Sequence, residues 1–171
     1  MRLVTFDFGM RTGWASGKPG ARPSFGHIKL TPCNGDYGKL MHEFGEFFQR
    51  MVRPGDKVAY ESPIVHGRNT LNVIMITVGL AVEAERICYQ MDDVDYLSFM
   101  PNQIKKTLAG HGWAEKEDMV KNARALGFPV HYHDEADAIG VWYTLLAMYD
   151  RMHKTNHMSI ALDPLFNRIS R

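Results

Sequence analysis

Hydrophobic and polar residues follow two different periods along the chain. Short apolar runs bounded by Gly and Pro are typical of strands in a sheet, and they predict strands at residues 2–8, 13–16, 24–30, 57–60 and 95–99. Longer segments with apolar residues every three or four positions are typical of helices, and they predict helices at residues 37–51, 69–90, 101–109, 116–126 and 134–151. Three strands come first and the later strands alternate with helices. We therefore expect an α/β fold with a five-stranded mixed sheet flanked by helices.

The helix expected at residues 69–90 is apolar on two faces, with Leu71, Ile74 and Val78 on one and Val73, Ile76 and Leu80 on the other. A helix with two apolar faces is buried on two sides. One side can pack on the sheet, and we expect the other to form a homodimer interface. Burial of both faces within a single chain is the alternative.

Composition narrows the class of protein without naming a function. The 171 residues suit one domain, which we place at residues 1–151 and follow with a tail at 152–171. A formal net charge of +1 does not by itself indicate a nucleic-acid-binding protein. The two cysteines, Cys33 and Cys88, form no disulfide framework or metal-binding spacing, which fits the cytoplasm. We expect no signal peptide, and residues 71–84 are too short and too polar to span a membrane.

Four acidic residues stand where an α/β fold would bring them together. Asp7 and Glu61 end two of the expected strands, and Asp134 and Asp137 lie three residues apart at the start of the last helix. The carboxyl ends of neighbouring strands line the usual ligand crevice of such a sheet. Each acid alone also suits an ordinary role as a turn residue, strand end, helix cap or helix-dipole partner. Their joint placement favours a site.

Clustered carboxylates repel one another, and a cation removes that repulsion. Oxygen ligands without nearby cysteines or paired histidines favour Mg²⁺ or Mn²⁺ over Zn²⁺. Two such ions about 3.5–4 Å apart can activate a water and stabilise the leaving oxygen of a phosphodiester. We therefore predict a metal-dependent nuclease with two Mg²⁺ ions, for which Mn²⁺ can substitute, held by Asp7, Glu61, Asp134 and Asp137.

Four sequence motifs resemble those of one nuclease family. They are F-D-F-G at residues 6–9, Y-E-S-P at 60–63, D-E-A-D-A at 134–138 and, most specifically, P-N-Q-I-K-K-T with G-H-G-W-A-E-K at 101–107 and 110–116. Together they resemble the RuvC-type Holliday-junction resolvases of the ribonuclease H-like superfamily, over about residues 2–147. The resemblance implies a ribonuclease H-like fold and a homodimeric crossover junction endodeoxyribonuclease. Such an enzyme cuts four-way DNA junctions by paired single-strand hydrolysis and leaves 5′ phosphates.

The resemblance also assigns basic residues to DNA. It implies that Lys105 and Lys116 contact DNA near the scissile phosphate, where cations neutralise the backbone and can stabilise developing charge. We count Lys116 among the catalytic residues as well, and we add Arg11 to the DNA-binding set. Lys106 and Lys121 are expected to be solvated surface residues.

The chain departs from many members of the family at Ile64, where they carry an aromatic residue that wedges into the junction. An isoleucine can also wedge between base steps, so we keep Ile64 among the DNA-binding residues. The alternatives are a less selective nuclease of branched DNA or RNA–DNA hybrids, and a non-catalytic DNA-structure-binding protein of the same fold. An actin-like ATPase is a further alternative, but the chain is short for two lobes and lacks a second phosphate-binding glycine motif.

Two aromatic residue types remain to be placed. We expect His133 to be a loop residue rather than a metal ligand. We expect the tryptophans, Trp14, Trp113 and Trp142, to be packing residues; Trp113 is the one that lies beside Lys116 in a Gly-flanked loop and could contact DNA.

Overall fold

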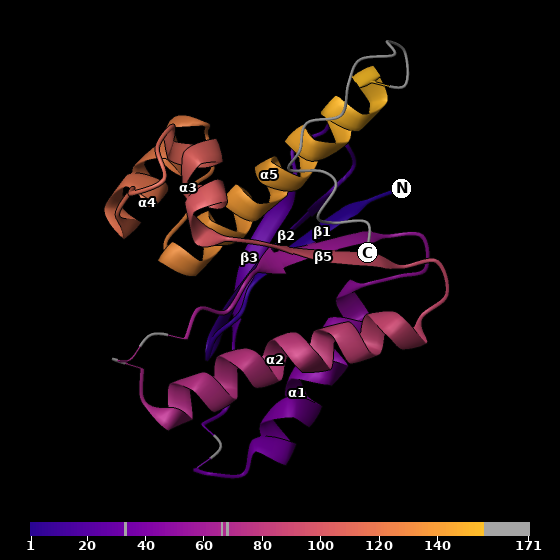
Figure 1. Ribbon diagram of the computed structural model, residues 1–171, viewed down its shortest axis with the longest axis vertical. Coiled ribbons are helices and arrows are strands. Elements are labelled where there is room, and N and C mark those ends of the chain that lie inside the picture. Colours follow the sequence, from indigo (N-terminus) through magenta and orange to yellow (C-terminus); the bar gives the residue numbers. More distant parts are fainter. Residues whose placement is uncertain (33, 66, 68, 156–171) are drawn as a thin grey trace.

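The computed structural model describes residues 1–32, 34–65, 67 and 69–155, with side chains as far as Arg151. Within this part of the chain, helices cover both faces of a five-stranded mixed sheet (Figure 1). The strands are β1 (Leu3–Asp7), β2 (Arg11–Gly17), β3 (Ser24–Lys29), β4 (Lys57–Glu61) and β5 (Asp95–Phe99). The helices are α1 (Tyr37–Met51), α2 (Leu71–Gln90), α3 (Pro101–Ala109), α4 (Lys116–Ala125) and α5 (His133–Thr155). The predicted α/β class is confirmed.

The order of the strands is β3-β2-β1-β4-β5. β1, β2 and β3 form an antiparallel meander, whereas β4 is parallel to both β1 and β5. In the parallel pair of β1 and β4, Phe6 lies opposite Tyr60. Asp7 and Glu61 follow these two residues, so both acids lie at the same edge of the sheet.

The two faces of the sheet pack against different helices. Val4 and Phe6 lie in one core with α1 and α2, whereas Leu3 lies in the other core with α3, α4 and α5 (Figure 1). Thr5 also faces α5, because its hydroxyl donates a 2.9 Å hydrogen bond to the carbonyl of Ala138. Side chains alternate between the faces of a strand, so Asp7 points to the α5 side.

Three details differ from the sequence prediction. α5 begins at His133, so this histidine belongs to the helix and its assignment to a loop is wrong. α5 also runs to Thr155, past the boundary expected at residue 151, and residues 156–171 of the expected tail lie outside the described residues, as does Cys33. In α2, Val73 is 43% exposed and does not share the buried face of Ile76 and Leu80. Within the described residues, no helix is long and apolar enough to cross a membrane.

Candidate active site

The four predicted acids come from three elements. Asp7 ends β1, Glu61 ends β4, and Asp134 and Asp137 lie in the first turns of α5. All four side chains are half-buried. Burial raises the pKa of Asp7 well above its ordinary value, and the negative charges of Asp137, Glu61 and Asp134 raise it further. The negative charges of the other three carboxylates therefore all act on Asp7.

The pKa values of two neighbouring acids, Glu61 and Asp137, are raised as well. Burial and the charge of Asp137 raise the pKa of Glu61 to about 7. Burial raises the pKa of Asp137 to about 6; Lys116 opposes this rise and Asp134 adds to it. These carboxyls therefore keep protons at pH values where exposed carboxyls have lost them.

This donor set fits a hard divalent cation, because carboxylate oxygens are the preferred ligands of Mg²⁺ and Mn²⁺ and because a cation would relieve the mutual repulsion. Among the residues that the structure describes, no group of three or more acidic, histidine or cysteine side chains is already arranged to hold one ion.

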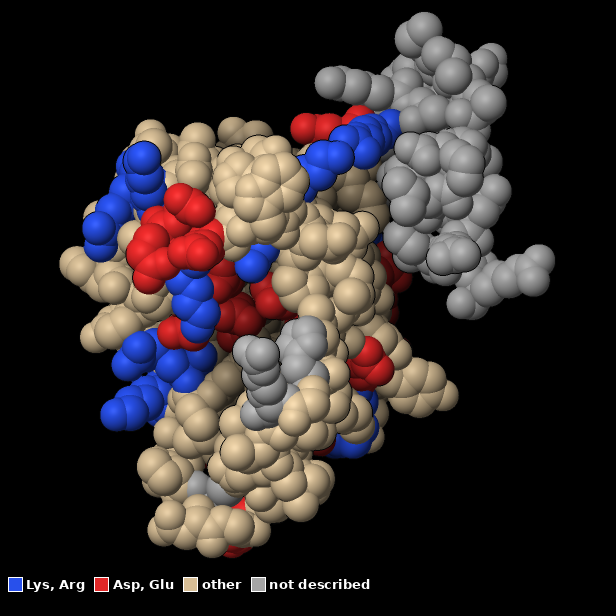
Figure 2. Space-filling view, turned by 60° about the vertical axis from the view of Figure 1, so that its left-hand side comes forward, with Lys and Arg blue, Asp and Glu red and all other residues tan. Residues whose placement is uncertain are grey.

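A cleft of about 580 Å³ opens beside Asp7 and Glu61. Its walls come from the segment after β4, the first half of α2 and the start of α3, and they include Ile64, Asn69, Thr77, Lys105 and Gly112. The side-chain amide of Asn69 donates a 3.3 Å hydrogen bond to the carbonyl of Ile64, which ties the segment after β4 to the start of α2. Figure 2 shows acidic atoms in a hollow near the middle of one face, with Lys and Arg atoms beside them.

The two predicted lysines come from neighbouring helices. α3 starts with Pro101, and the backbone N–H of Met100 donates a 2.9 Å hydrogen bond to the side chain of Gln103, which caps the helix. Lys105, in the same helix, lies in the cleft wall. Lys116 is the first residue of α4. Lys105 and Lys116 both lower the pKa values of Glu61 and Asp137, so their charges reach the acids. Lys106 and Lys121 are exposed, as predicted.

Known proteins resemble this chain in sequence and in fold, although no family model matches it. It is 35% identical to the RuvC crossover junction endodeoxyribonuclease of Rickettsia massiliae over 81 residues, which are 46% of this chain and 52% of that protein. The RuvC of Rickettsia conorii is 35% identical over 92 residues, 52% of this chain and 57% of that protein. The chain thus spans about half the length of the curated relatives it matches.

Solved structures extend the likeness over most of the chain. Thermus thermophilus RuvC in complex with a Holliday junction substrate has a TM-score of 0.62 and 28% sequence identity, and the match covers 90% of this chain and 96% of that one. The chain is therefore similar to RuvC proteins in sequence over about half of its length and in fold over most of it. The yeast mitochondrial Holliday junction resolvase Ydc2 shares the fold, with a TM-score of 0.61 at 13% identity over 92% of this chain and 84% of that one.

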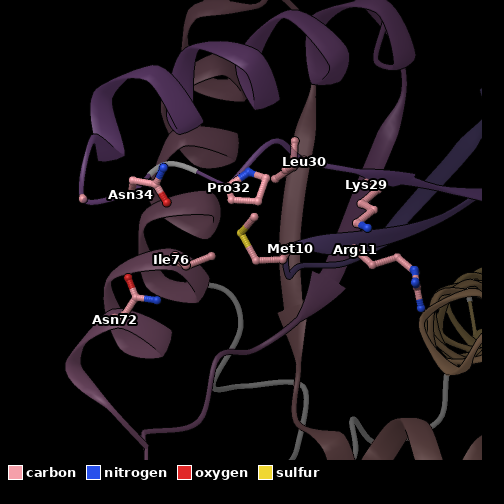
Figure 3. A pocket seen from close by; sticks show the side chains of 9 residues that line it. Met10, Arg11, Lys29, Leu30, Pro32, Asn34, Asn72 and Ile76 are labelled. Atoms are coloured by element: carbon pink, nitrogen blue, oxygen red, sulfur yellow. The ribbon is translucent and has the colours of Figure 1, made fainter.

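In this RuvC-type fold, Arg11 lies outside the cleft that holds Glu61 and Lys105. It borders a second pocket of about 430 Å³, together with Met10 and Lys29. Figure 3 shows the Arg11 side chain extending away from Met10. Its guanidinium lies 3.9 Å from the ring centre of Tyr132 and 3.8 Å from a carboxylate oxygen of Asp134. Arg11 therefore links the second pocket to the acids.

Glu135 is a positioning residue that the sequence did not reveal. It is only 5% exposed, and its carboxylate accepts hydrogen bonds from the backbone N–H groups of His131 (2.7 Å) and Tyr132 (3.2 Å) and contacts Nδ1 of His27 at 2.8 Å. Burial alone would raise the pKa of Glu135, but these contacts lower it. Glu135 thus holds the start of α5, which carries Asp134 and Asp137, against β3. His27 lies 108 residues away in the chain, so no local pattern signals the contact.

Proposed function

We propose that this chain is a metal-dependent endonuclease that resolves four-way (Holliday) DNA junctions by paired single-strand hydrolysis. One observation carries the proposal: Asp7 and Glu61, at the ends of β1 and β4, line one cleft with Lys105. The α5 acids and Lys116 lie close enough to act on the same carboxylates. The likeness to RuvC proteins supports the choice of a branched DNA substrate. An enzyme of this kind works in the cytoplasm, where the DNA of a bacterium or of its viruses is processed.

We infer that Asp7, Glu61, Asp134 and Asp137 hold two Mg²⁺ ions, with Mn²⁺ as a substitute. When bound, the ions would supply water activation and neutralisation of the charge that develops on the phosphodiester. Asp7 takes the central place, because the other three acids all act on it.

The lysines bind and orient the DNA strand in this proposal. Lys105 in the cleft wall and Lys116 at the start of α4 neutralise backbone phosphates. Lys116 is exposed yet acts on three of the acids. It is therefore placed to stabilise charge at the phosphate being cut. Ile64, which also lines the cleft, contacts the DNA, and Arg11 contacts the adjoining strand segment.

We propose that α2 joins two copies of the chain. Four of its exposed apolar residues recur at spacings of four and seven, which places them along one side of the helix: Leu71 (73% exposed), Met75 (45%), Val82 (59%) and Tyr89 (84%). Val73, which is also exposed, lies on another side. A two-fold dimer suits a two-fold junction, since its two active sites meet symmetry-related strands. Val82→Asp should produce a folded monomer by light scattering. If Val82→Asp has the same mass in solution as the wild-type dimer, the proposed interface is wrong.

The deciding experiment is cleavage of a four-way junction labelled on each strand in turn. With Mg²⁺ or Mn²⁺ we expect paired nicks at symmetry-related positions, with 5′ phosphates. Asp7→Asn should keep the fold and bind the junction but lose cleavage. Full cleavage by that variant would contradict the metal-ligand assignment. Absence of any cleavage by the wild-type chain would leave a non-catalytic DNA-structure-binding protein.

Neighbouring lysines provide matched controls. Lys116→Ala should slow cleavage more than it lowers stability, whereas Lys121→Ala, on the same helix, should leave the rate unchanged. The pair Lys105→Ala and Lys106→Ala makes the same comparison on α3. An unchanged rate in Lys116→Ala or in Lys105→Ala would assign that lysine to the solvated surface.

A less selective nuclease is the second candidate, because the residue in the cleft wall after β4 is the aliphatic Ile64. Cleavage of a four-way junction, a Y-shaped fork and an RNA–DNA hybrid under one set of conditions separates the two. Comparable rates on all three substrates would favour the less selective enzyme.

A further inference from the structure

Trp113 lies in the loop between α3 and α4 and is 81% exposed. The packing role predicted for it is therefore wrong, whereas Trp142 is 2% exposed and does pack in the core. Exposure alone is common among surface side chains and does not indicate a function. The construction of the loop and its position beside the cleft set Trp113 apart.

The loop holds the indole in a defined place. Gly110 closes α3 in the left-handed conformation, with φ of 86°, which glycine adopts without strain. A Cβ on Gly112 would lie 3.3 Å from the carbonyl oxygen of Asn102, so this part of the loop packs closely on α3. Ala114, on the other side of the tryptophan, is 1% exposed. Trp113 is thus anchored on both sides.

His111 supports one side of the indole. The imidazole and indole rings are stacked, with 4.8 Å between their centres and 29° between their planes. This stack restricts the rotation of the Trp113 side chain without covering it, since most of its surface is exposed. A second flat ring could therefore stack on the indole without displacing any contact.

The residues around Trp113 indicate which kind of ring would stack on the indole. Gly112 lines the same cleft as Asp7 and Lys105, and Lys116, three residues after Trp113, acts on the acids of that cleft. A flat aromatic surface next to cations is the combination that binds unpaired nucleotides, because the cations attract the phosphates and the ring stacks on the base. An apolar protein partner would not require the lysines.

We propose that Trp113, supported by His111, stacks on a nucleobase of the bound DNA strand beside the phosphate to be cut. This inference rests on the proposed function and deepens it. Bases within a duplex already stack on their neighbours, whereas bases at a branch point can leave the stack. Trp113 therefore favours branched or locally melted DNA over linear duplex.

The test uses full-length protein carrying Asp7→Asn, so that binding is measured without cleavage. Trp113→Ala should weaken junction binding by roughly 5- to 150-fold, as expected for loss of one stacked base, and Trp113→Phe should retain most of the affinity. Affinity for linear duplex should be nearly unchanged. Leu126→Ala, which alters an exposed apolar residue just past the end of α4, is the matched control and should not change binding.

Salt dependence separates stacking from charge. The slope of log Kd against log salt should stay the same in Trp113→Ala, because stacking releases no counterions, and should fall by about one in Lys116→Ala. Indole fluorescence should be quenched when the junction binds, and the quenching should disappear in Trp113→Phe. The fluorescence reading uses the parent and Trp113→Phe, so it remains informative even if the alanine variant folds poorly.

The outcomes distinguish the two proposals. A wild-type chain that cuts the junction, with Trp113→Ala and Trp113→Phe binding as tightly as their parent and with no quenching, overturns the stacking role alone. A wild-type chain that neither binds nor cuts the junction overturns the proposed function and the stacking role with it. Equal loss of junction and duplex binding in Trp113→Ala, without quenching in the parent, also overturns the stacking role.

Discussion

Glu61 lowers the stability of the metal-free protein, and this cost can be measured. Burial and the charge of Asp137 raise its pKa from the ordinary 4.5 to about 7. At pH 8 the folded chain carries this carboxyl charged, and the difference between the two pKa values corresponds to about 3 kcal/mol. Glu61→Gln keeps the shape and removes the charge. We expect this variant to be more stable in EDTA at pH 8 by up to about 3 kcal/mol, or roughly 5–10 °C in Tm for a chain of this size.

The sign of the pH dependence follows from the direction of the shift. A carboxyl whose folded pKa lies above its unfolded pKa contributes stability that is fully present below about pH 4.5 and is lost as the pH rises through about 7. The advantage of Glu61→Gln should therefore be small near pH 5 and largest at pH 8. Mg²⁺ should reduce or reverse it, because a ligand that binds only the folded state stabilises that state and the variant has lost a proposed ligand.

Thermal unfolding followed by circular dichroism, at pH 5 and pH 8 in EDTA and in Mg²⁺, checks each of these statements. Glu46→Gln is the matched control, because Glu46 is exposed on α1. Our reasoning fails if Glu61→Gln is no more stable than the wild type at pH 8. It also fails if the difference does not change with pH, or if Glu46→Gln gives the same gain.

Two further predictions test how the scaffold supports the site. A Cβ on Gly13 would lie 1.9 Å from the carbonyl oxygen of Asp134. Gly13→Ala should therefore cost about 1–3 kcal/mol in urea unfolding and, by displacing the start of α5, about 100-fold in cleavage rate. Gly38→Ala, where the added carbon meets only an ordinary 3.5 Å contact, should neither lower stability nor slow cleavage. Asp56 is 4% exposed, and its carboxylate accepts hydrogen bonds from the guanidinium of Arg2 at 2.6 and 3.2 Å. Asp56→Ala should therefore lower the free energy of unfolding by about 3–5 kcal/mol and leave the Mg²⁺ dependence of cleavage unchanged. A shifted Mg²⁺ dependence would contradict a purely structural role for Asp56.

The sequence was sufficient where the relevant physics is local. Asp7 and Glu61 each end an apolar strand, and the two-residue alternation of a strand fixes the face to which each side chain points. The spacing of Asp134 and Asp137 places them on one side of a helix. These rules depend only on neighbours in the chain, which is why the fold class and the convergence of the acids could be predicted.

The remaining features depend on contacts that no local pattern encodes. The apolar pattern of α2 did not show that Val73 is exposed while Ile76 is buried, because that depends on where α1 packs. The guanidinium of Arg11 lies over the ring of Tyr132, a contact between residues distant in the chain. Trp113 was expected to be a packing residue, with contact to DNA as the alternative, and hydrophobicity alone could not show that its side chain is 81% exposed.

The start of α5 shows why such long-range contacts matter for chemistry. Its acids face Asp7 and Glu61 on the sheet, and their mutual repulsion pushes the helix away from the strands. Three contacts oppose that force. The backbone at Asp134 packs on Gly13, the hydroxyl of Thr5 bonds to the carbonyl of Ala138, and Glu135 binds His27. None of these contacts uses a proposed metal ligand side chain. The helix can therefore stay in place when the proposed cations bind, and the repulsion among its acids and those of the sheet would favour that binding.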